Sequence, residues 1–148
     1  DIRASFIGMD SGHRRADFIR AVIEGITFSL YESIEQFRAG GKKISRVISI
    51  GGGAKSEQWL QIQADMFNAE IIRLKSEQGP AFGAAMLAAV GCGWFPALEA
   101  CAEQFVHVKE SFLPRPEFSE RYQDIFPIYK DIYRYTKPLI ERLAFLRE

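Results

Sequence analysis

Three consecutive glycines, Gly51 to Gly53, are the feature that most constrains how this chain can fold. A short apolar segment, residues 44–50, leads directly into them, and Ser56, a good helix N-cap, follows shortly after. Glycine lets the main chain approach a ligand that a Cβ would repel, and the start of a helix presents unpaired N–H groups and a positive dipole end. The order of strand, glycine turn and helix start therefore indicates a phosphate or nucleotide site. The alternative is a tight connection that binds no ligand.

Two familiar nucleotide motifs fit this turn only in part. Gly51, Gly53 and Ser56 follow the spacing of a dinucleotide fingerprint, but its last glycine is replaced and no acidic residue ends the next predicted strand. Lys55 and Ser56 have the order found in a P-loop, yet Ala54 stands where that motif requires glycine. Neither motif identifies the ligand by itself.

The segments around the turn indicate an α/β chain that is rich in helix. We expect strands over residues 44–50 and 70–74, and helices over 14–39, 56–68, 80–90, 96–105 and 117–148. The first helix carries an apolar stripe and a second set of small residues, which suggests a helix buried on two sides with close backbone approach at Gly25. The stripe consists of Ile19, Ile23, Ile26, Leu30, Ile34 and Phe37, and the small set of Ala21, Gly25 and Ser29. Two strands are too few for an independent sheet, so we expect partner strands N-terminal to Asp1.

Two further expectations concern the later helices. The small residues of the helix over 80–90 imply that it packs very closely on a neighbour. In the last helix, Pro127 and Pro138 predict breaks or kinks, because proline removes a helical hydrogen bond.

Composition excludes several classes of partner. The 148 residues include 19 basic and 19 acidic side chains, so charge gives no reason to expect binding to nucleic acid or to an acidic membrane. No apolar run is long enough to span a bilayer, and no cluster has metal-ligand spacing. Cys92 and Cys101 are interpreted as reduced thiols, which favours the cytoplasm.

Three motifs, taken in order, carry a family resemblance. The first runs from Ala4 to Met9 (Ala-x-Phe-x-Gly-Met) and resumes at Asp17 to Glu24 (Asp-Phe-x-x-Ala-Val-Ile-Glu). The second is the apolar strand with its three glycines, and the third runs from Gly79 to Ala85. Together they resemble the C-terminal part of the FGGY carbohydrate kinases, strongly over residues 1–95 and more loosely beyond.

This resemblance implies a fold and a division of the chain. The fold is part of an actin-like ATPase (ribonuclease H-like) C-terminal lobe, mostly helical with two short parallel strands. Residues 1–112 would form a partial adenosine-binding lobe, and residues 113–148 a helical extension that packs on it. Pro114 and Pro116 lie at the boundary between the two parts.

The resemblance also implies a reaction. Members of the family transfer the γ-phosphoryl group of ATP to a sugar hydroxyl, with Mg²⁺ on the phosphates and an aspartate that takes the hydroxyl proton. The sugar pocket and that aspartate belong to the N-terminal lobe. We therefore expect no catalytic residue and no metal ligand in this chain, and no activity from the chain alone.

Within the family, the segments 51–59 and 77–81 are most similar to the xylulose kinases. This implies conversion of D-xylulose to D-xylulose 5-phosphate by a longer parent protein. A kinase for glycerol, gluconate or ribulose is an alternative. A second alternative is a nucleotide-binding or interaction module without chemistry.

On this resemblance the adenosine side of the ATP site falls on Gly51, Gly52, Gly53, Glu57 and Gly83. Gly52 and Gly53 would bring the backbone against adenine, ribose or the α-phosphate, and Gly83 would let the following helix pack closely. Glu57 stands where glycerol-kinase-like members carry asparagine. It would bond a ribose hydroxyl or the adenine amino group, or would only stabilise the helix dipole.

The partners implied are ATP or ADP and a sugar bound by the other lobe, with no nucleic acid and no membrane. The strand over 44–50 would have an unpaired edge in the isolated chain, and exposed edges invite pairing. We therefore expect the isolated chain to self-associate.

Overall fold

The structure is a computed structural model that describes residues 4–75 and 79–146. Residues 77 and 78 of the subgroup motif lie outside the described residues, as do residues 147 and 148 of the expected last helix. In chain order the elements are α1 (Arg15–Ala39), β1 (Arg46–Ser49), the 3-10 helix η1 (Gly52–Lys55), α2 (Glu57–Phe67), β2 (Glu70–Leu74), α3 (Gly79–Gly91), α4 (Leu98–Phe105), β3 (Val108–Phe112) and α5 (Pro116–Phe145). The mostly helical α/β class is confirmed.

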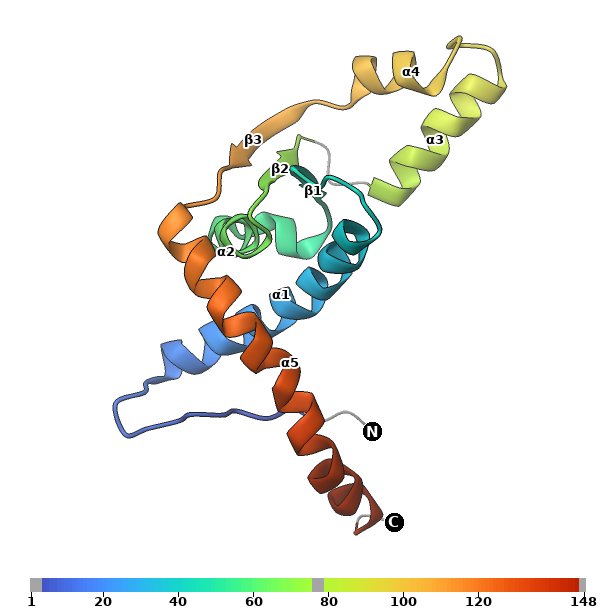
Figure 1. The fold of residues 1–148 in the computed structure, drawn as a ribbon. Helices are drawn as coiled ribbons and strands as arrows, with labels where there is room; N and C mark the ends of the chain where they lie inside the picture. Colours follow the sequence, from blue (N-terminus) through green and yellow to red (C-terminus); the bar gives the residue numbers. More distant parts are fainter. Residues whose placement is uncertain (1–3, 76–78, 147–148) are drawn as a thin grey trace.

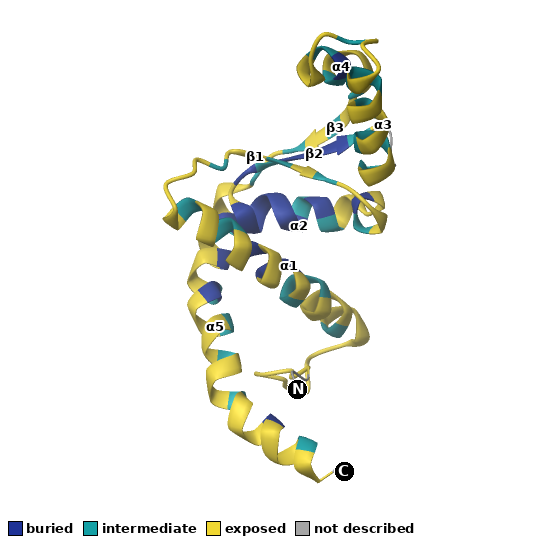
Figure 2. Ribbon diagram, turned by 90° about the vertical axis from the view of Figure 1, so that its right-hand side faces the viewer, coloured by how far each residue is buried: buried dark blue, intermediate teal, exposed yellow. Residues whose placement is uncertain are grey.

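A small sheet with the strand order β1-β2-β3 carries the glycine turn at the end of its first strand. β1 and β2 run parallel, as predicted. Arg46 lies opposite Glu70. β3 adds an antiparallel strand that the sequence did not predict, with Arg73 opposite Glu110. Helix α2 lies along one face of the sheet (Figure 2). The central strand β2 is therefore the buried one, and Ile71 has no exposed surface.

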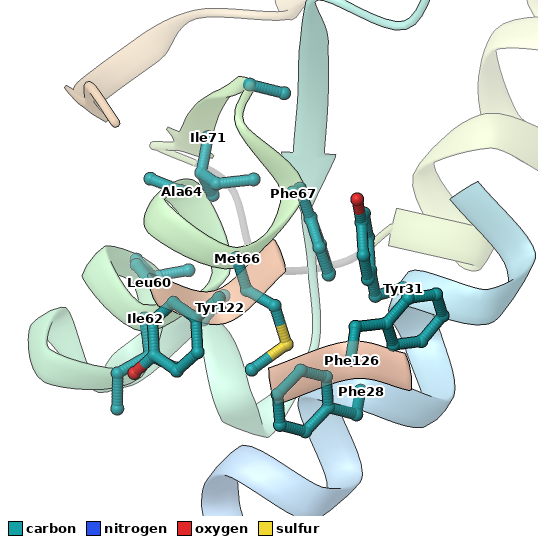
Figure 3. Packing of buried hydrophobic residues seen from close by; sticks show 12 residues of the cluster. Phe28, Tyr31, Leu60, Ile62, Ala64, Met66, Phe67, Ile71, Tyr122 and Phe126 are labelled. Atoms are coloured by element: carbon teal, nitrogen blue, oxygen red, sulfur yellow. The ribbon is translucent and has the colours of Figure 1, made fainter. Parts of the chain in front are cut away.

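Helices α1, α2 and α5 form the hydrophobic core together with β2 (Figures 1 and 3). Aromatic rings join α1 to α5: the centroids of Tyr31 and Phe126 are 4.6 Å apart and those of Phe28 and Tyr122 are 5.9 Å apart. Paired rings of this kind add about 0.5–1.5 kcal/mol beyond their buried area. The core is completed by Ala54, Leu60, Ile62, Ala64, Met66, Phe67, Ala69 and Ile71.

The buried face of α1 differs from the predicted stripe. Thr27, Phe28 and Tyr31 are buried, whereas Ile23 and Ile34 only border the core. The other stripe residues are about half exposed: Ile19, Ile26, Leu30 and Phe37. The physical reason is the packing of α1 against α2 and α5. The face of α1 that lies toward these helices is the one whose aromatic rings stack on theirs. The spacing of the apolar residues identified a stripe on α1, but it did not show which face of α1 would pack against another helix.

Helix α5 continues through both internal prolines, so the expected break is not found. Pro116 occupies the start of the helix, where its missing N–H costs nothing. Each internal proline removes a single helical hydrogen bond, and the packing of Phe126 beside Pro127 holds this part of the helix in the core.

The close packing expected of α3 is also not found. No residue of α3 is buried, and a Cβ added at Gly83 would meet no atom within 4 Å. α3 packs with α4, and the two helices project away from the rest of the molecule (Figure 1). Small residues permit a close approach, but no described element lies against the face that carries them.

Candidate functional site

The glycine turn has a conformation that its sequence requires. Gly51 has a φ of 82°, a region that side chains with a Cβ rarely adopt. The next residues form one 3-10 turn, in which the amide of Ala54 donates to the carbonyl of Gly51 at 3.1 Å. Gly52 faces open space, since a Cβ added there would meet no atom within 4 Å. The turn is therefore tight at its start and open to a ligand at its second glycine.

The start of α2 follows this turn directly. Ser56 is the N-cap, and its hydroxyl accepts a hydrogen bond from the amide of Trp59 at 3.3 Å, as predicted from its residue type. The amides of the preceding helical positions are those that a helix start leaves to water or to a ligand. The N-terminal end of α2 thus lies beside the open space at Gly52.

Trp59 supports the turn from the side of α1. A Cβ added at Gly53 would lie 2.8 Å from the Trp59 ring, so only glycine fits against this ring. The indole Nε1 donates to the hydroxyl of Thr27 at 2.9 Å, and Thr27 in turn donates to the carbonyl of Ile23 at 2.7 Å. Thr27 has no exposed surface. The half-buried Trp59 ring thereby joins the glycine turn to Thr27 of α1, and through Thr27 to the carbonyl of Ile23 in the first family motif.

Arg73 supports the turn from the side of the sheet. Its Nη1 donates to the carbonyl oxygens of Ala54 at 3.3 Å and of Lys55 at 3.4 Å. Its Nε and Nη2 donate to Glu110 of β3. The hydrogen bond to Glu110 is the largest cause of a raised pKa for the Arg73 guanidinium, which keeps it positively charged.

Glu57, one of the predicted site residues, pairs with this guanidinium. Its Oε1 lies 3.2 Å from Nη2 of Arg73, while 68% of its side chain is exposed. The carboxylate is therefore anchored at one end and open to solvent at the other. It also stands in the first turn of α2, where a negative charge is favourable. Its position is therefore compatible both with a contact to a nucleoside and with stabilisation of the helix dipole.

The predicted residues fall into two groups. Gly51, Gly52, Gly53 and Glu57 come together at the carboxyl end of β1 and the start of α2. Gly83 lies apart from them on α3.

An apolar cavity of about 210 Å³ opens beside the turn. It is bounded by Ile50, Leu74, Gly79, Phe82, Phe105 and His107, among others. A Cβ added at Gly79 would lie 2.7 Å from Ile50, so α3 begins in close contact with the residue that follows β1, whereas Gly83 has no such neighbour.

Sequence reasoning missed Arg73, Trp59 and Thr27. A signal for Arg73 was present, because it is a charged residue between the apolar Ile72 and Leu74 of a predicted strand, and buried charges are normally paired. Nothing in the sequence pointed to Thr27, whose role depends on the approach of α2 to α1.

Some features of the remaining described residues bear on the expectations about metals and membranes. Within 4–75 and 79–146, no group of three or more His, Cys, Asp or Glu side chains is placed to hold a metal ion. No helix in the same ranges has the length and apolar character needed to cross a membrane. Cys92 and Cys101 are both free, the first exposed and the second buried.

The fold and the turn together define an α/β lobe in which a glycine turn joins an edge strand to a capped helix. Residues 1–92 match the C-terminal domain of the FGGY family of carbohydrate kinases, and the chain belongs to this family. It is 55% identical over 147 residues to a xylulose kinase from Bacillus subtilis, a match that covers 99% of this chain and 30% of the relative. A gluconokinase from the same species is 26% identical over 147 residues, covering 97% of this chain and 28% of the relative.

Solved structures agree with this assignment. A ligand-bound xylulose kinase from Lactobacillus acidophilus superimposes with a TM-score of 0.84 at 32% identity, covering 92% of this chain and 28% of the other. A gluconate kinase from the same organism gives a TM-score of 0.83 at 32% identity, covering 91% and 27%. The actin-like fold expected from the resemblance is confirmed. This chain spans less than a third of the length of the relatives it matches.

The turn has features that fit an adenine nucleotide, the ligand that the family implies. Gly52 offers open backbone, the start of α2 offers amide donors, and Glu57 offers a partly solvated acceptor. The described residues bring no acidic cluster to the turn for a metal-bound triphosphate.

Proposed function

We propose that this chain is the adenosine-binding part of an ATP-dependent sugar kinase that phosphorylates D-xylulose to D-xylulose 5-phosphate. The observation that carries the proposal is the 55% identity to a xylulose kinase across almost the whole chain. Further relatives at 54% and 49% identity carry the same name, whereas the gluconokinases are at 26% and 25%. The same proposal places the kinase in the cytoplasm, which two free thiols favour.

In this proposal the chain binds one end of the nucleotide. Gly51 gives the turn its direction, Gly52 and Gly53 bring the main chain against adenine, ribose or the α-phosphate, and Glu57 accepts from a ribose hydroxyl or the adenine amino group. Gly83 belongs to the same site only if α3 lies closer to the turn in the longer protein. The open space at Gly52 and the exposed end of Glu57 support these roles.

The chemical steps take place on groups beyond this chain. ATP, with Mg²⁺ on its phosphates, supplies the phosphoryl group, and an aspartate of the N-terminal lobe takes the sugar proton. What the present residues supply is position, because a nucleoside held at the start of α2 directs its phosphates toward the other lobe. Phosphoryl transfer depends chiefly on such positioning and on charge stabilisation.

The test is a substrate panel with the full-length kinase that contains this chain. ADP release is measured with D-xylulose, gluconate, ribulose and glycerol as acceptors. The proposal expects the highest kcat/KM for D-xylulose. A preference for gluconate would replace the proposed substrate with the second candidate, which the gluconate kinase at a TM-score of 0.83 favours.

Measuring ADP binding by the same full-length protein distinguishes an enzyme from a binding module. If ADP binds but none of the four acceptors is phosphorylated, the chain belongs to a nucleotide-binding protein without chemistry, and the proposed reaction is wrong. If ADP does not bind at all, the assignment of the glycine turn is wrong as well.

A further inference from the structure

We propose that Arg73 is the positioning residue that holds the glycine turn in its nucleotide-binding shape, without touching the nucleotide itself. This inference rests on the proposed adenosine site and adds a residue to it. Arg73 is not part of the glycine motif. It lies on the next strand, β2, and the fold brings it to the turn.

The contacts of Arg73 with the turn fall directly after its three glycines. Its Nη1 donates to the carbonyl oxygens of Ala54 and Lys55, the last two residues of the 3-10 turn. Glycine loses more conformational freedom on ordering than any other residue, and three occur in sequence here. Two hydrogen bonds from one rigid group therefore fix the end of this turn, in addition to the Trp59 ring against Gly53 and the hydrogen bonds within the turn itself.

The same guanidinium connects four elements. From β2 it reaches η1 through the two carbonyls, α2 through Glu57, and β3 through Glu110. Arg73 is 9% exposed, so its guanidinium is largely shielded from water, whereas the side chains of its partners Glu110 and Glu57 are 33% and 68% exposed. The planar fork of arginine can make them together, whereas the single ammonium of lysine cannot span the same set.

The consequence for binding is preorganisation. A turn that is already in its bound shape does not have to be ordered when the nucleotide arrives, so less affinity is lost on binding. Arg73 also neutralises part of the charge of Glu57, which otherwise stands as a free carboxylate beside a polyanionic ligand. Loss of Arg73 should therefore weaken nucleotide binding and leave the sugar, bound elsewhere, unaffected.

A matched control lies on the neighbouring strand. Arg46 of β1 pairs with Glu70 at 3.0 Å, but its side chain is 65% exposed and its guanidinium contacts Glu70 rather than the turn. Both arginines bridge strands to a carboxylate. Only Arg73 also holds the turn.

The experiment uses the full-length kinase with Arg73→Gln, Arg73→Lys and the control Arg46→Gln. Each variant is measured for KM of ATP, KM of sugar, kcat, thermal midpoint, and ADP affinity by calorimetry. For both Arg73 variants we expect KM of ATP and Kd of ADP to rise roughly tenfold, with KM of sugar unchanged within about twofold. The control should match the wild type in all five quantities.

Several results would overturn the inference. They are an unchanged ADP affinity in Arg73→Lys, equal changes in both KM values together with a lower thermal midpoint, or the same losses in Arg46→Gln. If Arg73→Gln does not fold, Arg73→Lys decides, because it keeps the buried positive charge. A wild-type kinase that does not bind ADP rejects the proposed function, whereas intact wild-type binding with unaffected Arg73 variants rejects this inference alone.

Discussion

Asp65 of α2 accepts hydrogen bonds from both the main-chain amide and the guanidinium of Arg115, the N-cap residue of α5. The amide lies 2.9 Å from Oδ1 and Nη2 lies 2.6 Å from Oδ2. Asp65 is 1% exposed, and Gln61 donates to it as well, at 2.9 Å. One buried carboxylate therefore fixes the N-terminus of α5 onto α2, and with it the angle at which α5 crosses the core.

We expect the contact between Asp65 and Arg115 to contribute to the free energy of unfolding. Asp65→Ala should reduce the free energy of unfolding by about 2–3 kcal/mol, because hydrogen bonds to a charged acceptor are lost and the amide of Arg115 is left without its partner. The measurement is urea denaturation followed by circular dichroism. Glu141→Gln is the control, since its pair with Lys137 is 3.8 Å long and exposed, and its effect should stay below about 0.5 kcal/mol. Equal effects of the two substitutions would contradict the assignment.

The contact between α1 and α5 should make stability depend on alkaline pH. Two causes raise the pKa of Tyr122 from 10.0 to about 12. The larger is burial of the ring, and the second is the hydrogen bond that the Tyr122 hydroxyl donates to Glu24 at 2.7 Å. A group with a raised pKa contributes its full stability below its unfolded value. The contribution of Tyr122 is thus complete below pH 10 and is lost as the pH rises through about 12.

The test compares Tyr122→Phe with wild type from neutral to alkaline pH. The variant should be less stable at pH 8, because it lacks the bond to Glu24, and should lose less stability between pH 10 and about 12. Some alkaline loss should remain, since burial also raises the pKa of Tyr31 and Tyr129. Tyr133→Phe, at an exposed tyrosine, should follow the wild-type profile. Parallel profiles for wild type and Tyr122→Phe would rule out this linkage.

Two neighbouring glycines should respond differently to the same methyl group. Gly53→Ala places a Cβ 2.8 Å from the Trp59 ring and should destabilise the protein by about 1–3 kcal/mol through overpacking. Gly52→Ala meets nothing and should change stability by less than about 0.5 kcal/mol, while weakening ADP binding by occupying the open space. Thermal midpoints and ADP titration of the full-length kinase separate the two effects. Unchanged ADP affinity in Gly52→Ala would remove Gly52 from the site.

The isolated chain should self-associate. Ile48 and Ile50 at the edge strand are each 50% exposed, and the outer face of α1 exposes Ile26 and Leu30 to a similar extent. Exposed apolar side chains in these numbers favour association, and β1 has an unpaired edge (Figure 2). Sedimentation velocity should show species larger than the monomer, and Ile26→Glu with Leu30→Glu should reduce them. A monomeric wild type at high micromolar concentration would contradict this expectation.

The isolated 148-residue chain should not phosphorylate D-xylulose. The described residues assemble no acidic cluster that could hold a metal-bound phosphate, and the proposed base and sugar pocket belong to the other lobe. The measurement is ADP formation from ATP with and without D-xylulose. Sugar-dependent ADP formation by this chain would show that the division between the lobes is wrong.

Local chemistry made much of the architecture predictable. The strand Glu70–Leu74, the N-cap Ser56 and the positive φ of Gly51 follow from residue type and near neighbours, and each is found as expected or as its residue type requires. Motif order was specific enough to identify the family before any fold was known. These features depend on contacts a few residues apart, which a sequence displays directly.

Partners distant in the chain decided the rest. Which stripe of α1 is buried depends on rings of α5 almost a hundred residues away, and β3 pairs with β2 across a gap in sequence that Arg73 and Glu110 bridge. The support of the glycine turn is of the same kind, since Trp59 and Arg73 reach it from two sides of the fold. The residue types alone determined that a glycine turn would form, because only glycine has the required freedom. Tertiary packing decided how firmly that turn is held, because its rigidity comes from groups that only the folded chain brings to it.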